Sequence, residues 1–158
     1  ESGVICRWKH RSSGVLFDMM PVDPSVLGFS NPWYPEAVRT AQRVTLRSGL
    51  DIRLVAAPAF VASKLEAFVT RGKSDYLSSH DLEDVLIVVD GRPSLVAEMA
   101  AAAPDLRAAV QGHFRALLAD PNFDDVLPGL VDDGGSPSNG RAEIVLDRLR
   151  EIVGGADA

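Results

Sequence analysis

The 158-residue sequence has a single cysteine, few aromatic residues and no long hydrophobic run. Because Cys6 has no second cysteine to pair with, the chain has neither an internal disulfide framework nor a cysteine-based zinc site, which is typical of the reducing cytosol. The longest uncharged apolar stretch, from Leu54 to Ala62, is far shorter than the roughly 20 residues that cross a bilayer. We therefore expect a cytoplasmic protein with no membrane span and no membrane partner.

Positive charge is scarce in the second half of the chain. Residues 1–79 hold ten Lys and Arg against seven Asp and Glu, whereas residues 80–158 hold six against fifteen, for a formal net charge of -6. This division excludes a uniformly basic nucleic-acid-binding surface and a general binder of anionic membranes. A local basic groove in the first half remains compatible with the sequence.

The first 57 residues have the pattern of short strands joined by turns. Two hairpins are predicted, one from Val4–Trp8 with Gly14–Met20 and one from Gln42–Leu46 with Ile52–Val55. The proline-rich segment 21–35 predicts an irregular connection, and a short helix follows over Tyr34–Ala41. We expect the strands to form a mixed or antiparallel sheet.

Helical patterns begin at residue 58. One amphipathic stripe, with apolar residues at i, i+3, i+4 and i+7, predicts a buried helix face made of Leu82, Val85, Leu86 and Val89. Start and stop residues predict five helices in this half, over Ala59–Thr70, from the cap Ser79 to Val89, and over Ser94–Ala103, Asp105–Leu118 and Arg141–Val153.

The predicted fold class is therefore α+β, and 46% apolar residues in a chain of this length favour one compact domain. A sheet portion over residues 1–57 precedes a helical portion over 58–130. A polar, glycine-rich flexible linker over 131–140 then leads to a C-terminal helix and tail over 141–158.

Asp18 is unusual because it stands in an otherwise apolar strand, residues 15–20. A buried carboxylate costs several kcal/mol unless it is paired or bound to a metal ion. The residue is therefore either a functional carboxylate or an outward-facing strand residue.

Lys64 and Arg71 form a second unusual pattern. At about 100° per residue they lie on one strip of the predicted 59–70 helix, beside its apolar stripe. Such a pair can bind phosphate oxygens, Arg through a bidentate fork and Lys as a point charge. The alternative is a solvated helix face.

Asp81 and Asp84 lie at i and i+3, hence on one flank of the following helix. Capping and compensation of the helix dipole also favour acids at this end of a helix. The acidic flank and the basic strip can nevertheless form a polar network, with Asp81 or Asp84 orienting Lys64 or Arg71.

Other residue patterns give weaker evidence for a functional site. The segment from Gly28 to Pro32 lacks the closing glycine of a nucleophile elbow, and the sequence has no phosphate-binding glycine loop. The three histidines have no metal-ligand spacing. The segment Arg7–Arg11 interleaves Trp8 with basic groups, which suits either a nucleic-acid contact or a charged turn.

Several segments in order carry a family resemblance, which covers about residues 3–130: Val4-Ile5-Cys6-Arg7-Trp8, Phe17-Asp18-Met19-Met20-Pro21, Gly28-Phe29-Ser30-Asn31-Pro32-Trp33-Tyr34-Pro35, Lys64-Leu65-Glu66-Ala67-Phe68 and Ser79-His80-Asp81-Leu82-Glu83-Asp84-Val85. The chain resembles the AbiEii-type nucleotidyltransferases (the AbiEii/AbiGii toxin family) of the polymerase-β-like superfamily. Many of these are toxins of toxin–antitoxin or phage-defence systems.

The resemblance implies transfer of a nucleotidyl group from a nucleoside triphosphate to an acceptor hydroxyl, and several members modify tRNA. It assigns Asp18 as a Mg²⁺ ligand, matching the family's third carboxylate, and Lys64 as the nucleotide-contacting lysine. Asp81 or Asp84 matches a later acidic motif. The implied partners are a nucleoside triphosphate, tRNA, a cognate antitoxin or a second copy of the chain.

The sequence departs from the family upstream of Asp18. The family has a Gly-Ser motif and an Asp-x-Asp pair there, whereas residues 1–17 contain neither, and no Asp at all. We expect the chain to be either the C-terminal part of such an enzyme or a degenerate, non-catalytic relative that binds a protein partner. In both cases Mg²⁺-nucleotide should bind poorly or not at all, and an incomplete sheet edge should favour self-association.

Overall fold

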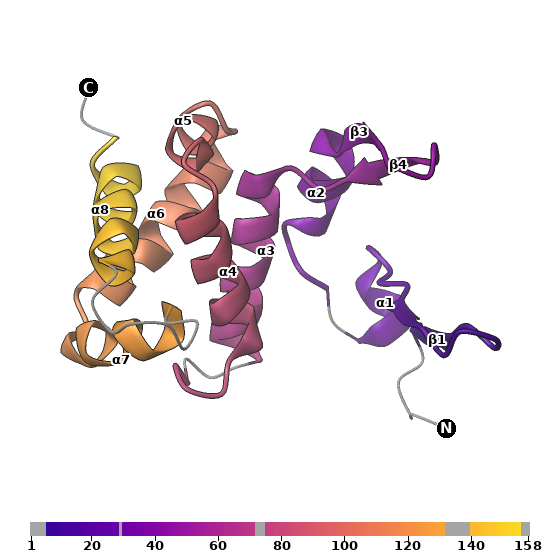
Figure 1. Ribbon diagram of the computed structural model, residues 1–158, viewed down its shortest axis with the longest axis horizontal. Coiled ribbons are helices and arrows are strands. Elements are labelled where there is room, and N and C mark those ends of the chain that lie inside the picture. The colour runs from indigo at the N-terminus through magenta and orange to yellow at the C-terminus, as the bar shows by residue number, and fades with distance from the viewer. Residues whose placement is uncertain (1–5, 29, 72–74, 132–139, 156–158) are drawn as a thin grey trace.

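The computed structural model describes residues 6–28, 30–71, 75–131 and 140–155. The chain is mostly helical, with two small antiparallel sheets near its N-terminal end (Figure 1). The predicted α+β class is confirmed. Among the described residues, no helix is both long and apolar enough to cross a membrane.

The strands form two separate hairpins rather than one sheet. Strand β1 (Arg7–Lys9) pairs with β2 (Leu16–Asp18), and β3 (Gln42–Thr45) pairs with β4 (Asp51–Leu54). The antiparallel alternative of the prediction is confirmed for the described residues, but the single sheet is not, because two helices separate the hairpins and each strand has only three or four residues. In the second hairpin Gly49 has φ +82°, a positive value that glycine adopts without steric cost.

Two short helices occupy the connection between the hairpins. Helix α1 (Pro24–Leu27) lies in the segment predicted to be irregular, and α2 (Tyr34–Thr40) matches its prediction. The side chain of Asp23 caps α1 by accepting from the Ser25 backbone N–H at 2.8 Å, and Gly28 ends it with φ 75°. An Asp-Pro start and a glycine stop were the signals of this helix.

Six helices make up the rest of the described chain: α3 (Ala57–Thr70), α4 (His80–Gly91), α5 (Leu95–Ala100), α6 (Pro104–Leu118), α7 (Pro121–Val131) and α8 (Arg141–Gly154). Five of them match predicted segments. Helix α7 was not predicted, since Pro128 inside it interrupts the helical pattern. The predicted linker falls almost entirely on 132–139, outside the described residues.

The hydrophobic core lies within these six helices. The stripe predicted on α4 is buried, with every one of its four residues at most 1% exposed, and it packs with side chains of α3, α5, α6, α7 and α8. Full burial of one such side chain stabilises the fold by about 1.5–3 kcal/mol. This packing fixes α3 against α4 and so positions the polar residues on their flanks.

Candidate functional site

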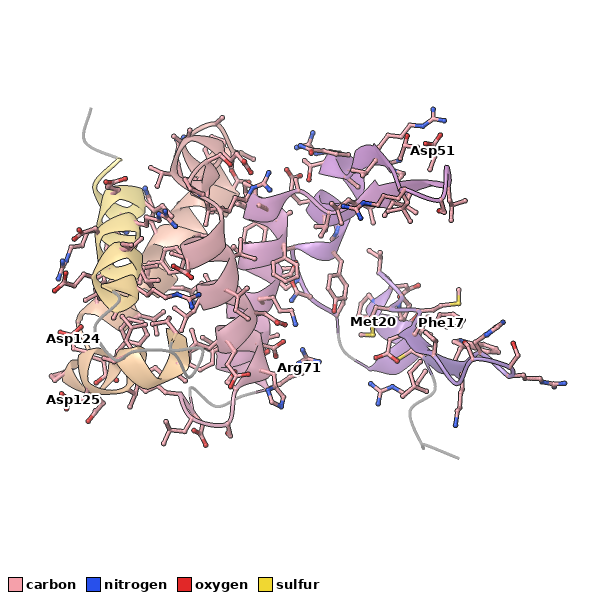
Figure 2. The ribbon with its side chains drawn as sticks, in the orientation of Figure 1. Phe17, Met20, Asp51, Arg71, Asp124 and Asp125 are labelled. Carbon is pink, nitrogen blue, oxygen red and sulfur yellow. The ribbon has the colours of Figure 1, made fainter. Side chains whose placement is uncertain are left out.

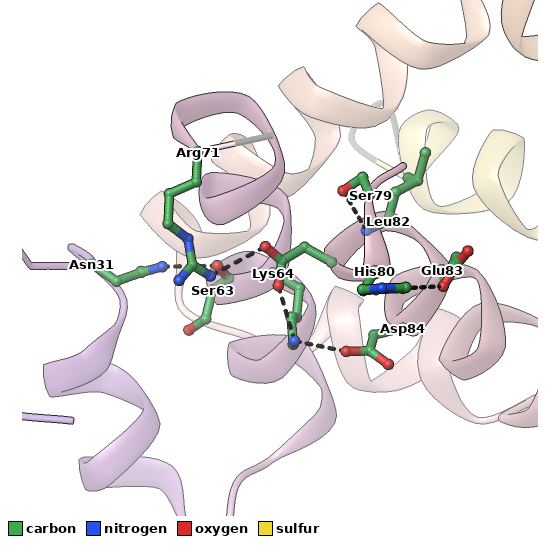
Figure 3. Close-up of polar contacts among 10 residues, drawn as sticks. Asn31, Ser63, Lys64, Arg71, Ser79, His80, Leu82, Glu83 and Asp84 are labelled. Atoms are coloured by element: carbon green, nitrogen blue, oxygen red, sulfur yellow. Dashed lines mark hydrogen bonds and ion pairs between the residues drawn. The ribbon is translucent and has the colours of Figure 1, made fainter. Parts of the chain in front are cut away.

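The predicted cations of α3 meet the predicted carboxylates of α4 (Figure 3). Lys64 Nζ lies 3.0 Å from Asp81 Oδ1 and 2.6 Å from Asp84 Oδ2. Arg71 Nη2 lies 3.1 Å from Asp81 Oδ2. The polar network expected from the sequence is therefore confirmed, and we call these four residues the ion-pair network.

Local sequence explains why the network forms. Ser79 caps α4 by accepting from the Leu82 backbone N–H at 3.3 Å, which places Asp81 in the first helical turn. Negative side chains are stabilised there by the helix dipole. On α3, Lys64 is adjacent to the fully buried Leu65, so its stem starts at the interface between the two helices.

The two carboxylates differ in their surroundings. Asp81 bridges both cations and its side chain is 19% exposed, whereas Asp84, among the described residues, forms an ion pair with Lys64 alone and is 43% exposed. Asp81 thus holds Lys64 and Arg71 in place, while Asp84 is the carboxylate that solvent or a ligand reaches more readily.

Lys64 keeps its charge in this setting. Burial lowers its pKa, but the hydrogen bonds to Asp84 and Asp81 outweigh burial and raise the pKa above the ordinary lysine value. The ammonium group also lies 5.8 Å from the centre of the Phe60 ring, a favourable cation–π distance. Lys64 is therefore a fixed positive charge at neutral pH.

A cavity of about 500 Å³ adjoins the network through Arg71. Its lining comes from the last two turns of α3 and from the segment that enters α2: Ser30, Asn31, Tyr34, Glu66, Ala67, Thr70 and Arg71. The volume lies within the range of about 300–1,000 Å³ that small-molecule sites occupy. The network thus forms one border of a space large enough for a small-molecule ligand.

Asn31 attaches the outer wall of this cavity to α3. Its Nδ2 donates to the Ser63 carbonyl oxygen at 2.8 Å, and its Oδ1 accepts from the Trp33 backbone N–H at 3.0 Å. The side chain is buried and both polar ends are satisfied. Sequence reasoning did not single out Asn31, Tyr34 or Glu66, because the cavity joins segments more than thirty residues apart.

Asp18 lies elsewhere. It is exposed on β2 and forms a two-pronged ion pair with Arg7 of β1, at 2.8 Å from Nε and from Nη2. This pairing lowers the pKa of Asp18. Figure 2 shows the neighbouring Phe17 on the hairpin, apart from Arg71. Of the two alternatives for Asp18, the described residues support the outward-facing one.

The described residues do not by themselves fit a Mg²⁺ site. No three His, Cys, Asp or Glu side chains within the described ranges group where they could hold a metal ion. Asp18 is already satisfied by Arg7. Its role as a Mg²⁺ ligand stays a prediction.

Comparison with known protein families, curated proteins and solved structures found no match to this chain. The functional proposals therefore rest on the geometry of the site and on the resemblance of its sequence segments.

Proposed function

We propose that the ion-pair network binds the phosphates of a nucleoside triphosphate in a protein that transfers a nucleotidyl group to an acceptor hydroxyl, with RNA such as tRNA as the acceptor class. The observation that carries the proposal is the meeting of Lys64 and Arg71 with Asp81 and Asp84 beside a cavity of about 500 Å³. Arg71 lines this cavity, and positively charged side chains form the strong, charge-assisted hydrogen bonds that bind phosphate oxygens.

The donors of Lys64 leave room for a phosphate. An ammonium group has three N–H donors, and Asp81 and Asp84 accept from it. A phosphate oxygen takes the third donor or replaces Asp84, the more exposed carboxylate. Asp81 continues to hold Lys64 and Arg71 while this exchange takes place, so it acts as a positioning residue.

The transfer itself needs no covalent protein intermediate. The acceptor hydroxyl oxygen forms a bond to the α-phosphorus, the bond from that phosphorus to pyrophosphate breaks, and the hydroxyl proton passes to Asp84, the more exposed carboxylate. Lys64 and Arg71 stabilise the negative charge of the phosphates during this step.

Transfer of an α-³²P-labelled nucleotide to total tRNA, measured with the natural gene product, tests the proposal. Replacing Lys64 with Met removes the charge and keeps the stem, and should lower transfer by about 100-fold, the typical cost of losing one charge-stabilising donor. The matched control is Lys9→Met, on the exposed strand β1. Unchanged transfer by Lys64→Met would overturn the proposal.

A second candidate is a non-catalytic module that binds a protein partner, either a cognate antitoxin or a second copy of the chain. One face of the β1–β2 hairpin favours it, since Trp8, Phe17 and Met19 are each about half exposed or more. A two-stranded sheet alone is marginally stable in water, and its edges can accept another strand. Concentration-dependent sedimentation together with absent nucleotidyl transfer would favour the second copy as the partner, and a monomer at all concentrations would count against self-association.

A further inference from the structure

Two side chains that line the cavity have unused hydrogen-bonding groups. Glu66 and Tyr34 are both half-buried, one on α3 and one at the start of α2. In the described parts of the chain, neither the Glu66 carboxylate nor the Tyr34 hydroxyl is hydrogen-bonded to another residue. The neighbouring charges of Lys64, Arg71 and Asp81 are all paired.

This contrast points to a ligand. No buried side-chain oxygen or nitrogen among the described residues lacks a partner, so the Glu66 carboxylate is open to the cavity and can accept hydrogen bonds from a bound molecule. An ionised carboxylate is only an acceptor, so the ligand must present O–H or N–H groups to Glu66. The Tyr34 ring offers a flat apolar surface on which a planar ring can stack.

The third chemical feature of the cavity is Arg71. Its guanidinium is paired with Asp81 on one side, and its side chain lines the cavity on the other. Arg71 therefore lies between the cavity and Lys64, the proposed phosphate-binding lysine. A ligand with a planar ring for Tyr34, hydrogen-bond donors for Glu66 and a chain of phosphates for Arg71 and Lys64 matches these groups.

We propose that the cavity binds the nucleoside part of the nucleotide, with the base stacked on Tyr34 and hydrogen bonds donated to Glu66. The donors are either the ribose hydroxyls or the N–H groups of the base. This inference rests on the proposed function and extends it, because it assigns Tyr34 and Glu66 as the residues that distinguish a nucleotide from a bare phosphate chain. Arg71 marks the junction between nucleoside and phosphates.

The test compares ligands with and without a nucleoside. The full chain is titrated with ATP, CTP, GTP, UTP and inorganic tripolyphosphate, and dissociation constants are measured by NMR, which detects weak binding. At least one nucleoside triphosphate should bind about tenfold more tightly than tripolyphosphate. Glu66→Gln should reduce this advantage about three- to tenfold, the effect of one hydrogen bond, and Tyr34→Leu should reduce it similarly.

Two further variants separate the pocket from the phosphate site. Lys64→Met should weaken nucleoside triphosphates and tripolyphosphate alike, and so preserve their ratio. Glu151→Gln, on the exposed face of α8, removes the same charge as Glu66→Gln and should leave every dissociation constant unchanged.

Deoxyribonucleotides show which part of the nucleoside Glu66 contacts. If Glu66→Gln abolishes a preference for ribose over deoxyribose, Glu66 binds the sugar. If it abolishes a preference among the four bases, Glu66 binds the base.

The outcomes distinguish this inference from the proposed function. Equal affinity for nucleotides and tripolyphosphate, or an advantage that survives both Glu66→Gln and Tyr34→Leu, would overturn the pocket assignment and leave the role of Lys64 intact. Failure of every ligand to bind would instead overturn the proposed function, and the pocket assignment with it.

Discussion

The helical body and the two hairpins differ sharply in how they are stabilised. Apart from Cys6, every buried apolar residue of the described chain belongs to the region from Pro58 to Ile152. The hairpins instead expose large apolar side chains and are joined across their strands by ion pairs such as Arg7–Asp18 and Arg43–Asp51. Exposed pairs of this kind contribute only about 0–1 kcal/mol each.

This difference explains where the site can be well ordered. The ion-pair network rests on α3 and α4, whose facing residues Leu65, Leu82 and Val85 are completely buried. Binding groups on such a rigid support are held close to the geometry that a ligand needs. The opposite wall of the cavity comes from the N-terminal region and depends on Asn31 for its attachment.

The largest expected effect contrasts two phenylalanines. Phe114 is 0% exposed in the core and Phe17 is 49% exposed on β2. Phe114→Ala should lower the free energy of unfolding by about 3–5 kcal/mol because it leaves a cavity, whereas Phe17→Ala should change it by less than about 0.5 kcal/mol. Urea denaturation followed by circular dichroism measures both. Similar losses of unfolding free energy in the two variants would mean that Phe17 is packed against other side chains and not exposed.

The next effect concerns the two carboxylates of the network. Asp81→Asn weakens contacts to two cations and should destabilise the protein by about 2 kcal/mol, since hydrogen bonds to charged groups are worth about 1.5–3 kcal/mol. Asp84→Asn affects one exposed contact and should cost at most about 1 kcal/mol. Thermal unfolding of the two variants side by side provides the measurement, and the reverse order would contradict the positioning role of Asp81.

A smaller effect tests whether Tyr76, in the turn after α3, stabilises the helical region. Tyr76 donates to Asp120 Oδ2 at 2.6 Å and its ring stacks on Phe68, with centroids 5.9 Å apart. Tyr76→Phe keeps the ring and removes the hydrogen bond, which should cost about 1 kcal/mol in urea denaturation. The matched control is Tyr34→Phe, whose hydroxyl has no partner in the described structure and should cost nothing.

The smallest effect is a pH dependence of the network. Because the folded-state pKa of Lys64 is raised, its contribution is fully present below the unfolded pKa of about 10.4 and is lost as pH rises through the folded value. The difference in unfolding free energy between the native chain and Lys64→Met should therefore be constant near neutral pH and shrink at alkaline pH.

Tyr76 titrates in the same alkaline range and has to be controlled for. Burial and Asp120 raise the pKa of Tyr76 to about 12, so the stabilisation from its hydrogen bond fades between about pH 10 and 12. The same difference measured in a Tyr76→Phe background isolates Lys64, and a difference that grows with pH would contradict the ion pairing.

Local patterns in the sequence predicted most helices and half of the site. The buried stripe of α4, the Ser79 cap and the facing of Lys64 toward Asp81 and Asp84 all follow from helical spacing and two adjacent helices. The separation of the hairpins and the Asn31 attachment were not predicted, because both depend on packing between distant segments. Asp18 illustrates the limit: its apolar neighbours left a functional carboxylate and an outward-facing residue both open, and a two-stranded sheet buries neither of its faces here.

Titration of the ¹⁵N-labelled chain with inorganic tripolyphosphate tests the central claim most directly, that Lys64 and Arg71 form a phosphate-binding site. We expect weak but saturable binding, with amide shifts centred on α3 and α4, that is about tenfold weaker in Lys64→Met and unchanged in Lys9→Met. Shifts without saturation, or shifts centred on the β1–β2 hairpin and equal in the two variants, would show that the network only joins two helices.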